Sequence, residues 1–227
     1  MRMAAGRWEL DIRPERGGRI VSLRLDGEEL LDQGIGVDQP TANGFVEGGA
    51  FGWDEMVPNL EPAGELPDHG EAWRLPWHAL DWPTDTVTMR CSGRIVPWEL
   101  QRTLTLKADS VIAVYVYANV GVEPHAAYWC AHPLFKYETD MEVSVEIPRP
   151  AHGRSAKVFI PGRSLERVRV GRIEQSWDPF LSADVGVWVC NGDLGGYRQI
   201  AFEPATASPI LEPGESVTWW LQIRALD

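Results

Sequence analysis

The chain has 227 residues, and 44% of them are hydrophobic, which is enough to bury a sizeable core without disulfides or metals. Its formal net charge of −12 repels nucleic acid and anionic membranes, so a neutral ligand is the simplest expectation. Three cysteines without a CxxC pair, and no apolar stretch that fits a signal peptide or membrane span, predict a cytoplasmic protein with no nucleic-acid or membrane partner.

The first predicted element is a half-buried antiparallel strand in RIVSLRLDGEELL. Its apolar residues Val21, Leu23 and Leu25 alternate with polar ones, and Asp26-Gly27 is a hairpin turn signal. The next stretch, residues 32–82, is rich in Gly, Pro and Trp and shows no periodicity. A loop of this length is usually functional or disordered, and its aromatic content favours a functional loop.

Later segments repeat the period of two. QRTLTL and VTWWLQIR alternate, and VIAVYVYANV is apolar on both faces, which predicts a central strand covered on each side. VGVWVCNG is predicted to end in an Asn191-Gly192 turn before a strand through YRQIAFEP. No window of 11 residues has a helical stripe. We therefore predict an all-β protein, an antiparallel β-sandwich formed by a single domain over residues 1–227.

Metal and nucleophilic sites have weak sequence support. The five histidines form no HxH or HExxH motif, and the chain contains no GxSxG elbow. His69, His132 and Glu203 could still converge as a two-histidine, one-carboxylate metal site. Cys130 shares a strand face with His132, but a thiol in this aromatic setting is more often inert. Acid–base chemistry by histidine and carboxylate is the simpler interpretation, with no metal and no cofactor.

Glu203 lies in the predicted strand YRQIAFEP. Alternation places Ile200 and Phe202 on one face and Tyr197, Gln199, Ala201 and Glu203 on the other. The second face is typical of a ligand-binding floor. Pro204 is expected to end the pairing of this strand, which would let Glu203 project at a rim.

Four segments in order resemble the aldose 1-epimerase (galactose mutarotase-like) superfamily. They cover nearly the whole chain: LDIRPERGGRIVSLRLDGEELL, then GWDEMVPN with DHGEAWRLPW, then QRTLTLKADSVIAVYVYANVGVEPHAAYWCAHPLF, and finally IAFEPATASPILEPGESVTWWLQI. The resemblance implies a β-supersandwich that binds a monosaccharide and interconverts its anomers. It also implies that Glu203 is the base, that His132 is the general acid, and that His69 hydrogen-bonds the sugar. A histidine with a pKa near 6.5 to 7 suits the acid role.

The chain also departs from the superfamily. Members carry an arginine in the early loop that grips sugar hydroxyls, and FVEGGAFGWDEMVPN has none, so Asp54 or Glu55 is expected to form that wall. We expect Trp53 and Trp73 to stack on the sugar and Arg102 to contact it. The missing arginine keeps a second hypothesis open, namely a carbohydrate-binding or regulatory protein without turnover on the same fold.

Overall fold

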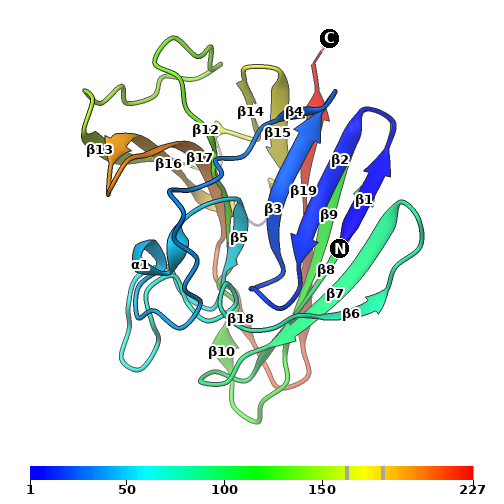
Figure 1. The fold of residues 1–227 in the computed structure, drawn as a ribbon. Helices are drawn as coiled ribbons and strands as arrows, with labels where there is room; N and C mark the ends of the chain where they lie inside the picture. The colour runs from blue at the N-terminus through cyan, green and yellow to red at the C-terminus, as the bar shows by residue number, and fades with distance from the viewer. Residues whose placement is uncertain (162–163, 180–181, 227) are drawn as a thin grey trace.

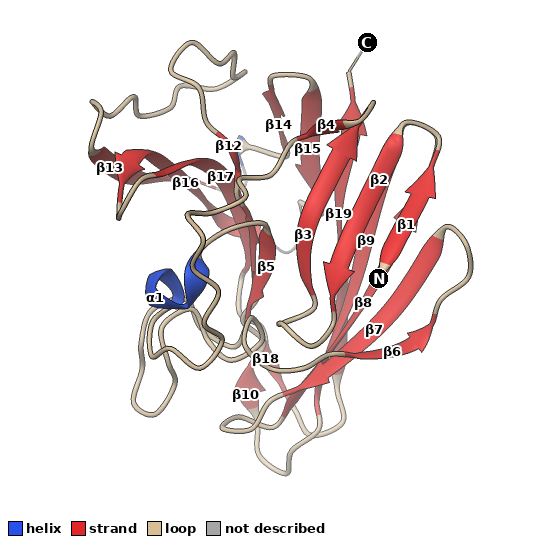
Figure 2. Cartoon of the chain, in the orientation of Figure 1, coloured by secondary structure: helices blue, strands red, loops and turns tan. Residues whose placement is uncertain are grey.

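Two antiparallel β-sheets form the protein, and they pack face to face (Figure 1). The computed structural model describes residues 1–161, 164–179 and 182–226. Within these residues the one α-helix is α1 (Phe45–Gly49), which lies among loops beside strand β5 (Trp53–Met56), as Figure 2 shows. The prediction of an all-β, antiparallel sandwich is confirmed.

The larger sheet runs in the order β1-β2-β3-β5-β11-β17-β16-β13, with β4 beside β3 and β12 beside β17. Its other strands are β1 (Arg2–Ala5), β2 (Trp8–Arg13), β3 (Arg19–Leu25), β4 (Glu28–Glu29), β11 (Cys130–Pro133), β12 (Phe135–Lys136), β13 (Arg154–Pro161), β16 (Ser182–Asp193) and β17 (Tyr197–Thr206).

The smaller sheet has seven strands in the order β14-β15-β19-β9-β8-β7-β6, and a separate two-stranded ladder pairs β10 with β18. These strands are β6 (His78–Asp81), β7 (Thr86–Ser92), β8 (Trp98–Leu106), β9 (Ser110–Asn119), β10 (His125–Ala126), β14 (Arg167–Val170), β15 (Ile173–Trp177), β18 (Ile210–Leu211) and β19 (Ser216–Ala225). None of the helices in the described ranges has the length and apolar character needed to cross a bilayer.

The central strands of the larger sheet are covered on both faces. Its inner face packs against the smaller sheet through a main core that includes Ile200 and Phe202 of β17. Its outer face holds a second apolar cluster, in which Tyr197 and Ala201 of the same strand meet Phe45 of α1. The alternation predicted for YRQIAFEP is therefore confirmed, and the segment before β6 acts as a lid of loops over the outer face.

Of the two predicted hairpin turns, the structure has the one at Asp26-Gly27 and lacks the one at Asn191-Gly192. Asp26 and Gly27 both have positive φ (53° and 80°), as a two-residue hairpin turn requires, and they join β3 to β4. The Asn191-Gly192 prediction is wrong, because both residues lie inside β16. The strand shifts register between Asn191 and Asp193, and the turn follows at residues 194–196.

Two strand predictions also need correction. The irregular stretch contains β5, which lies in the middle of the larger sheet between β3 and β11. Strand β9 is central in its sheet as predicted, but its second face is not covered, since Val114 is 38% exposed. In addition, Pro204 does not end β17, which continues to Thr206, so Glu203 lies within the sheet and not at its rim.

Candidate active site

The outer face of the larger sheet brings charged side chains from three strands together. His132 on β11 pairs across the sheet with Asp54, and Glu203 on the neighbouring strand β17 lies opposite Gly186 of β16. Lys157 belongs to β13, the next strand after β16. Residues that face each other across paired strands project from the same side of the sheet, so these side chains share one surface.

The centre of this cluster is the Glu203 carboxylate. Its Oε1 lies 3.3 Å from His132 Nε2, and its Oε2 lies 2.7 Å from Lys157 Nζ. Glu203 is only 1% exposed and His132 only 4%. Both carboxylate oxygens are thus engaged, in a place that water scarcely reaches.

Burial and neighbouring charges set the protonation states here. Burial raises the pKa of the Glu203 carboxyl, but His132 and Lys157 outweigh it and lower that pKa to about 2. Burial lowers the pKa of His132 below its ordinary value of 6.5; Glu203 opposes this shift, and His69 and Lys157 add to it. The pKa near 6.5 to 7 that the sequence suggested for His132 is therefore too high, because the ring is almost fully buried. At neutral pH the carboxylate is ionised beside a largely neutral imidazole.

His69 reaches the cluster from the loop before β6. Its Nδ1 lies 2.9 Å from Asp68 Oδ1, and its ring stacks on Phe45 (centroids 4.6 Å apart) and meets the His132 ring edge to face at 5.4 Å. Asp68 also accepts a hydrogen bond from the Phe45 backbone N–H at 3.2 Å. His69 has φ of +60°, an uncommon conformation for a residue other than glycine. The loop and α1 together hold this ring against His132.

A cavity of about 260 Å³ opens onto Glu203. The aromatic rings of Tyr128 and Phe159 and the side chain of Leu60 line it, and Asp184 is also part of its wall. Phe159 is 61% exposed, which is unusual for a phenylalanine on a strand. Aromatic faces of this kind stack against the C–H faces of sugars. His132 is not among the lining residues and lies against Glu203, which is one of them.

Three residues predicted to bind the sugar lie on the inner side of the sheet instead. Trp53 is fully buried in the main core. Glu55 and Arg102 are also fully buried and pair with each other at 2.8 Å. As placed, none of the three can contact a ligand in the cavity, because their side chains project toward the smaller sheet.

The two remaining candidates lie on the outer side but are covered. Asp54 neighbours His132, yet its carboxylate is fully buried in an ion pair with Arg19 (2.7 Å). Trp73 has no exposed surface and packs edge to face under Phe45, with ring centroids 5.3 Å apart. Both therefore differ from the prediction, since they are buried beside the site and offer no surface to a sugar.

Lys157, Tyr128 and Phe159 are functional candidates that the sequence did not reveal. Lys157 and Phe159 are two residues apart in RSAKVFIP, so their spacing is compatible with one strand face. Nothing in the local sequence, however, indicates that this strand lies next to β16 and Glu203. That information is in the sheet register alone.

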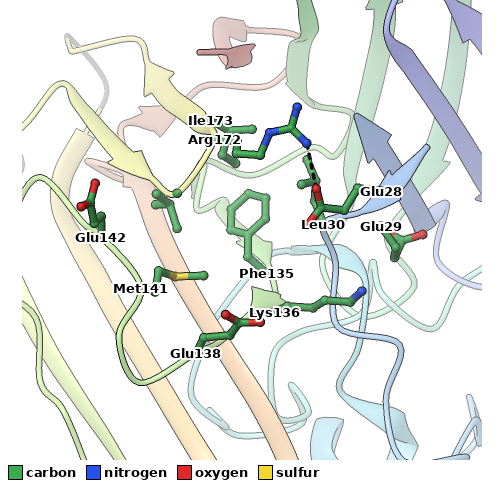
Figure 3. A pocket seen from close by; sticks show the side chains of 12 residues that line it. Glu28, Glu29, Leu30, Phe135, Lys136, Glu138, Met141, Glu142, Arg172 and Ile173 are labelled. Atoms are coloured by element: carbon green, nitrogen blue, oxygen red, sulfur yellow. Dashed lines mark hydrogen bonds and ion pairs between the residues drawn. The ribbon is translucent and has the colours of Figure 1, made fainter. Parts of the chain in front are cut away.

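Two other features of the described residues concern possible binding sites. Within the ranges the structure describes, no group of three or more His, Cys, Asp or Glu side chains is arranged to hold a metal ion. A second hollow of about 220 Å³ lies where β4 and β12 meet the β14–β15 hairpin (Figure 3). Its floor is apolar, and none of His69, His132 and Glu203 lines it.

Comparisons with known proteins bear on the fold. No protein-family model matches the chain, and no curated protein matches it. Among solved structures, a candidate aldose 1-epimerase from Escherichia coli K12 superposes with a TM-score of 0.77 at 16% identity, covering 98% of this chain and 97% of that one. A galactose mutarotase-like protein from Lactobacillus casei gives 0.77 at 13% identity, covering 99% of each chain.

A galactose mutarotase-like protein from Clostridium acetobutylicum gives a TM-score of 0.73 at 12% identity, covering 98% of this chain and 93% of that one. These similarities extend over nearly the full length of the proteins compared. The chain therefore has the galactose mutarotase-like fold, as its four sequence segments predicted.

Proposed function

We propose that the protein interconverts the anomers of a neutral monosaccharide by acid–base catalysis. The observation that carries the proposal is the buried pair of Glu203 and His132, 3.3 Å apart, with Glu203 facing a cavity lined by aromatic rings. A carboxylate that stays ionised is a suitable base, and an adjacent imidazole can act as the acid in the same event. The fold shared with aldose 1-epimerase-like proteins supports this chemistry.

The reaction follows from the roles of the two groups. Glu203 removes the proton of the anomeric hydroxyl, while His132 in its protonated form gives a proton to the ring oxygen, and the bond between C1 and that oxygen breaks. The open-chain aldehyde rotates and closes on its other face, and the two protons return. A sugar hydroxyl that reaches Glu203 must displace His132 or Lys157 from one carboxylate oxygen, because both oxygens are engaged. The sugar must also move past the cavity lining, since His132 lies behind it. His69 is proposed to hydrogen-bond the sugar.

Polarimetry or exchange NMR on freshly dissolved α-glucose and α-galactose tests the proposal. Acceleration of anomer exchange in proportion to protein concentration supports an enzyme. Binding without acceleration selects the alternative of a carbohydrate-binding protein. The engagement of both Glu203 oxygens favours this alternative, as does the missing early-loop arginine.

The charge of the cavity argues for an unphosphorylated sugar. Among the described residues that line it, Asp184 and Glu203 are acidic, and the nearby cation Lys157 is already paired with Glu203 at 2.7 Å. A like charge about 4 Å away costs about 1 kcal/mol even in water. We therefore expect kcat/KM for glucose 6-phosphate to be at least about fivefold below that for glucose. A 6-deoxy sugar serves as the neutral control, and a preference for the phosphorylated sugar would contradict the charge argument.

The lowered pKa values predict an acidic pH optimum. His132 must be protonated to act as the acid, so kcat/KM should fall as the pH rises through its pKa, which lies below 6.5. Glu203 must be ionised, so the acidic limb should lie near its pKa of about 2. The rate at pH 5 should exceed that at pH 8, with circular dichroism confirming a folded protein at both. A rate that keeps rising to pH 8 would exclude His132 as the acid.

A further inference from the structure

Lys157 reaches the Glu203 carboxylate from two strands away. On the intervening strand β16, Lys157 lies opposite Trp188, while Glu203 lies opposite Gly186. A Cβ atom added at Gly186 would come within 2.7 Å of Glu203 Oε2 and 3.3 Å of Lys157 Cε. Gly186 is not among the glycines with positive φ, so its backbone conformation does not require glycine. Its lack of a side chain instead leaves room for neighbouring side chains. The missing side chain is what allows the lysine to cross β16.

The ion pair between Lys157 and Glu203 is partly buried in the sheet. Lys157 Nζ lies 2.7 Å from Glu203 Oε2, and the lysine side chain is 26% exposed whereas the glutamate is 1% exposed. A carboxylate at this depth is costly unless a cation accompanies it. The neighbouring charged and titratable groups are His132 and Cys130 on β11, Tyr128 before it, Asp184 on β16, and Glu61 and His69 from the covering loop.

These neighbours cannot take the place of Lys157. Burial raises the pKa values of Cys130 and Tyr128, so both remain neutral. Asp184 and Glu61 are acidic, and burial lowers the pKa of His132. Attraction to Glu203 outweighs burial and raises the pKa of Lys157, which is therefore a permanent positive charge.

We propose that Lys157 is a positioning residue of the proposed reaction, whose ammonium group keeps the buried Glu203 carboxylate ionised and fixed in one orientation beneath the cavity. The inference rests on the proposed function. It makes Lys157 the counter-ion of the base, so that His132 is free to exchange its proton with the sugar. Lys157 acts through Glu203 and needs no contact with the sugar.

The proposal has a signature in pH that a purely structural lysine would lack. Removing the cation should raise the pKa of Glu203, because burial then acts with less opposition. It should also raise the pKa of His132, because Lys157 is one of the charges that lower it. Both limbs of the pH–rate profile should move to higher pH, whereas simple loss of structure lowers the profile without moving it.

The test uses the full chain with ¹³C-labelled glutamate carboxyls, and Glu203→Gln identifies the Glu203 signal. Lys157→Met should raise the Glu203 titration midpoint above its value of about 2, and should move the acidic limb of kcat/KM to higher pH by the same amount. Lys157→Arg should restore both values. Lys107→Met, at an exposed lysine in the turn between β8 and β9, is the matched control.

Gly186→Ala provides a second route that removes no charge. Its new methyl group should separate Lys157 from Glu203 and move the titration in the same direction. A Glu203 midpoint unchanged in both Lys157→Met and Gly186→Ala would overturn the inference. If the midpoint moves but the wild-type protein never accelerates anomer exchange, the proposed function is overturned, while the coupling of Lys157 to Glu203 is supported.

Discussion

Replacing Glu203 with glutamine is expected to lower kcat for anomer exchange by at least about 10²-fold while sugar binding survives. Glutamine keeps the size of the side chain and one acceptor oxygen, but it cannot accept a proton at neutral pH. Stopped-flow polarimetry gives the rate, and saturation-transfer NMR gives the binding. Glu212→Gln, at an exposed glutamate outside the cavity, should leave the rate unchanged.

Partner substitutions sharpen this assignment of roles. His132→Asn should cause a loss similar to that of Glu203→Gln, and the double variant should be little worse than either single one, because both groups serve one event. His69→Asn should be milder if its ring positions the sugar. A Glu203→Gln protein that keeps most of its rate would show that another carboxylate is the base, or that the observed exchange is not enzymatic.

Replacing Glu55 with alanine is expected to destabilise the protein by about 3–5 kcal/mol. The Glu55 carboxylate accepts hydrogen bonds from Arg102 (2.8 Å), Tyr115 (2.9 Å) and Trp129 (2.7 Å), and it is fully buried. Without it, Arg102 remains in the core as an unpaired charge, and two further donors lose their acceptor. Urea unfolding measures the loss.

Two further variants separate the buried charge from the loss of packing. Glu55→Met combined with Arg102→Met should recover much of the stability, because it removes both charges together. Glu28→Gln, in an exposed pair with Arg172, should leave the unfolding midpoint unchanged. A loss below about 1 kcal/mol for Glu55→Ala would show that the network adds little. Anomer exchange retained by the double methionine variant would place Glu55 and Arg102 outside the sugar site.

Alternation of apolar and polar residues predicted which face of a sheet a side chain occupies, but not which strands lie next to each other. The alternation around Glu203 placed it correctly on the outer face, opposite to Phe202, because one face of β17 packs in the main core. The same pattern in β8 puts Arg102 at an inward position among buried leucines, which is where it lies. An arginine at such a position signals a buried partner, and this signal was available in the sequence.

The local sequence does not indicate which residues of different strands come into contact. The sequence did not predict strand β5, because WDEM combines an apolar tryptophan and methionine with two carboxylates. These carboxylates are buried because Arg19 and Arg102 form ion pairs with them. The contact between Lys157 and Glu203 depends on the register of two strand pairs and on the space at Gly186. The resemblance to a family supplied His69, His132 and Glu203, but a residue outside its motifs, such as Lys157, required the structure.

Strand β13 is the last strand of its sheet, and this position affects how the site opens. It pairs only with β16 in the sheet order, and its residues are partly or fully exposed, whereas β17 is almost entirely buried. Edge strands with few buried contacts open locally at lower free-energy cost than central ones. Amide hydrogen exchange should therefore be faster in β13 than in β17. Each local opening of β13 would withdraw Lys157 while Glu203 stays in place, so the strength of the base depends on the stability of an edge strand.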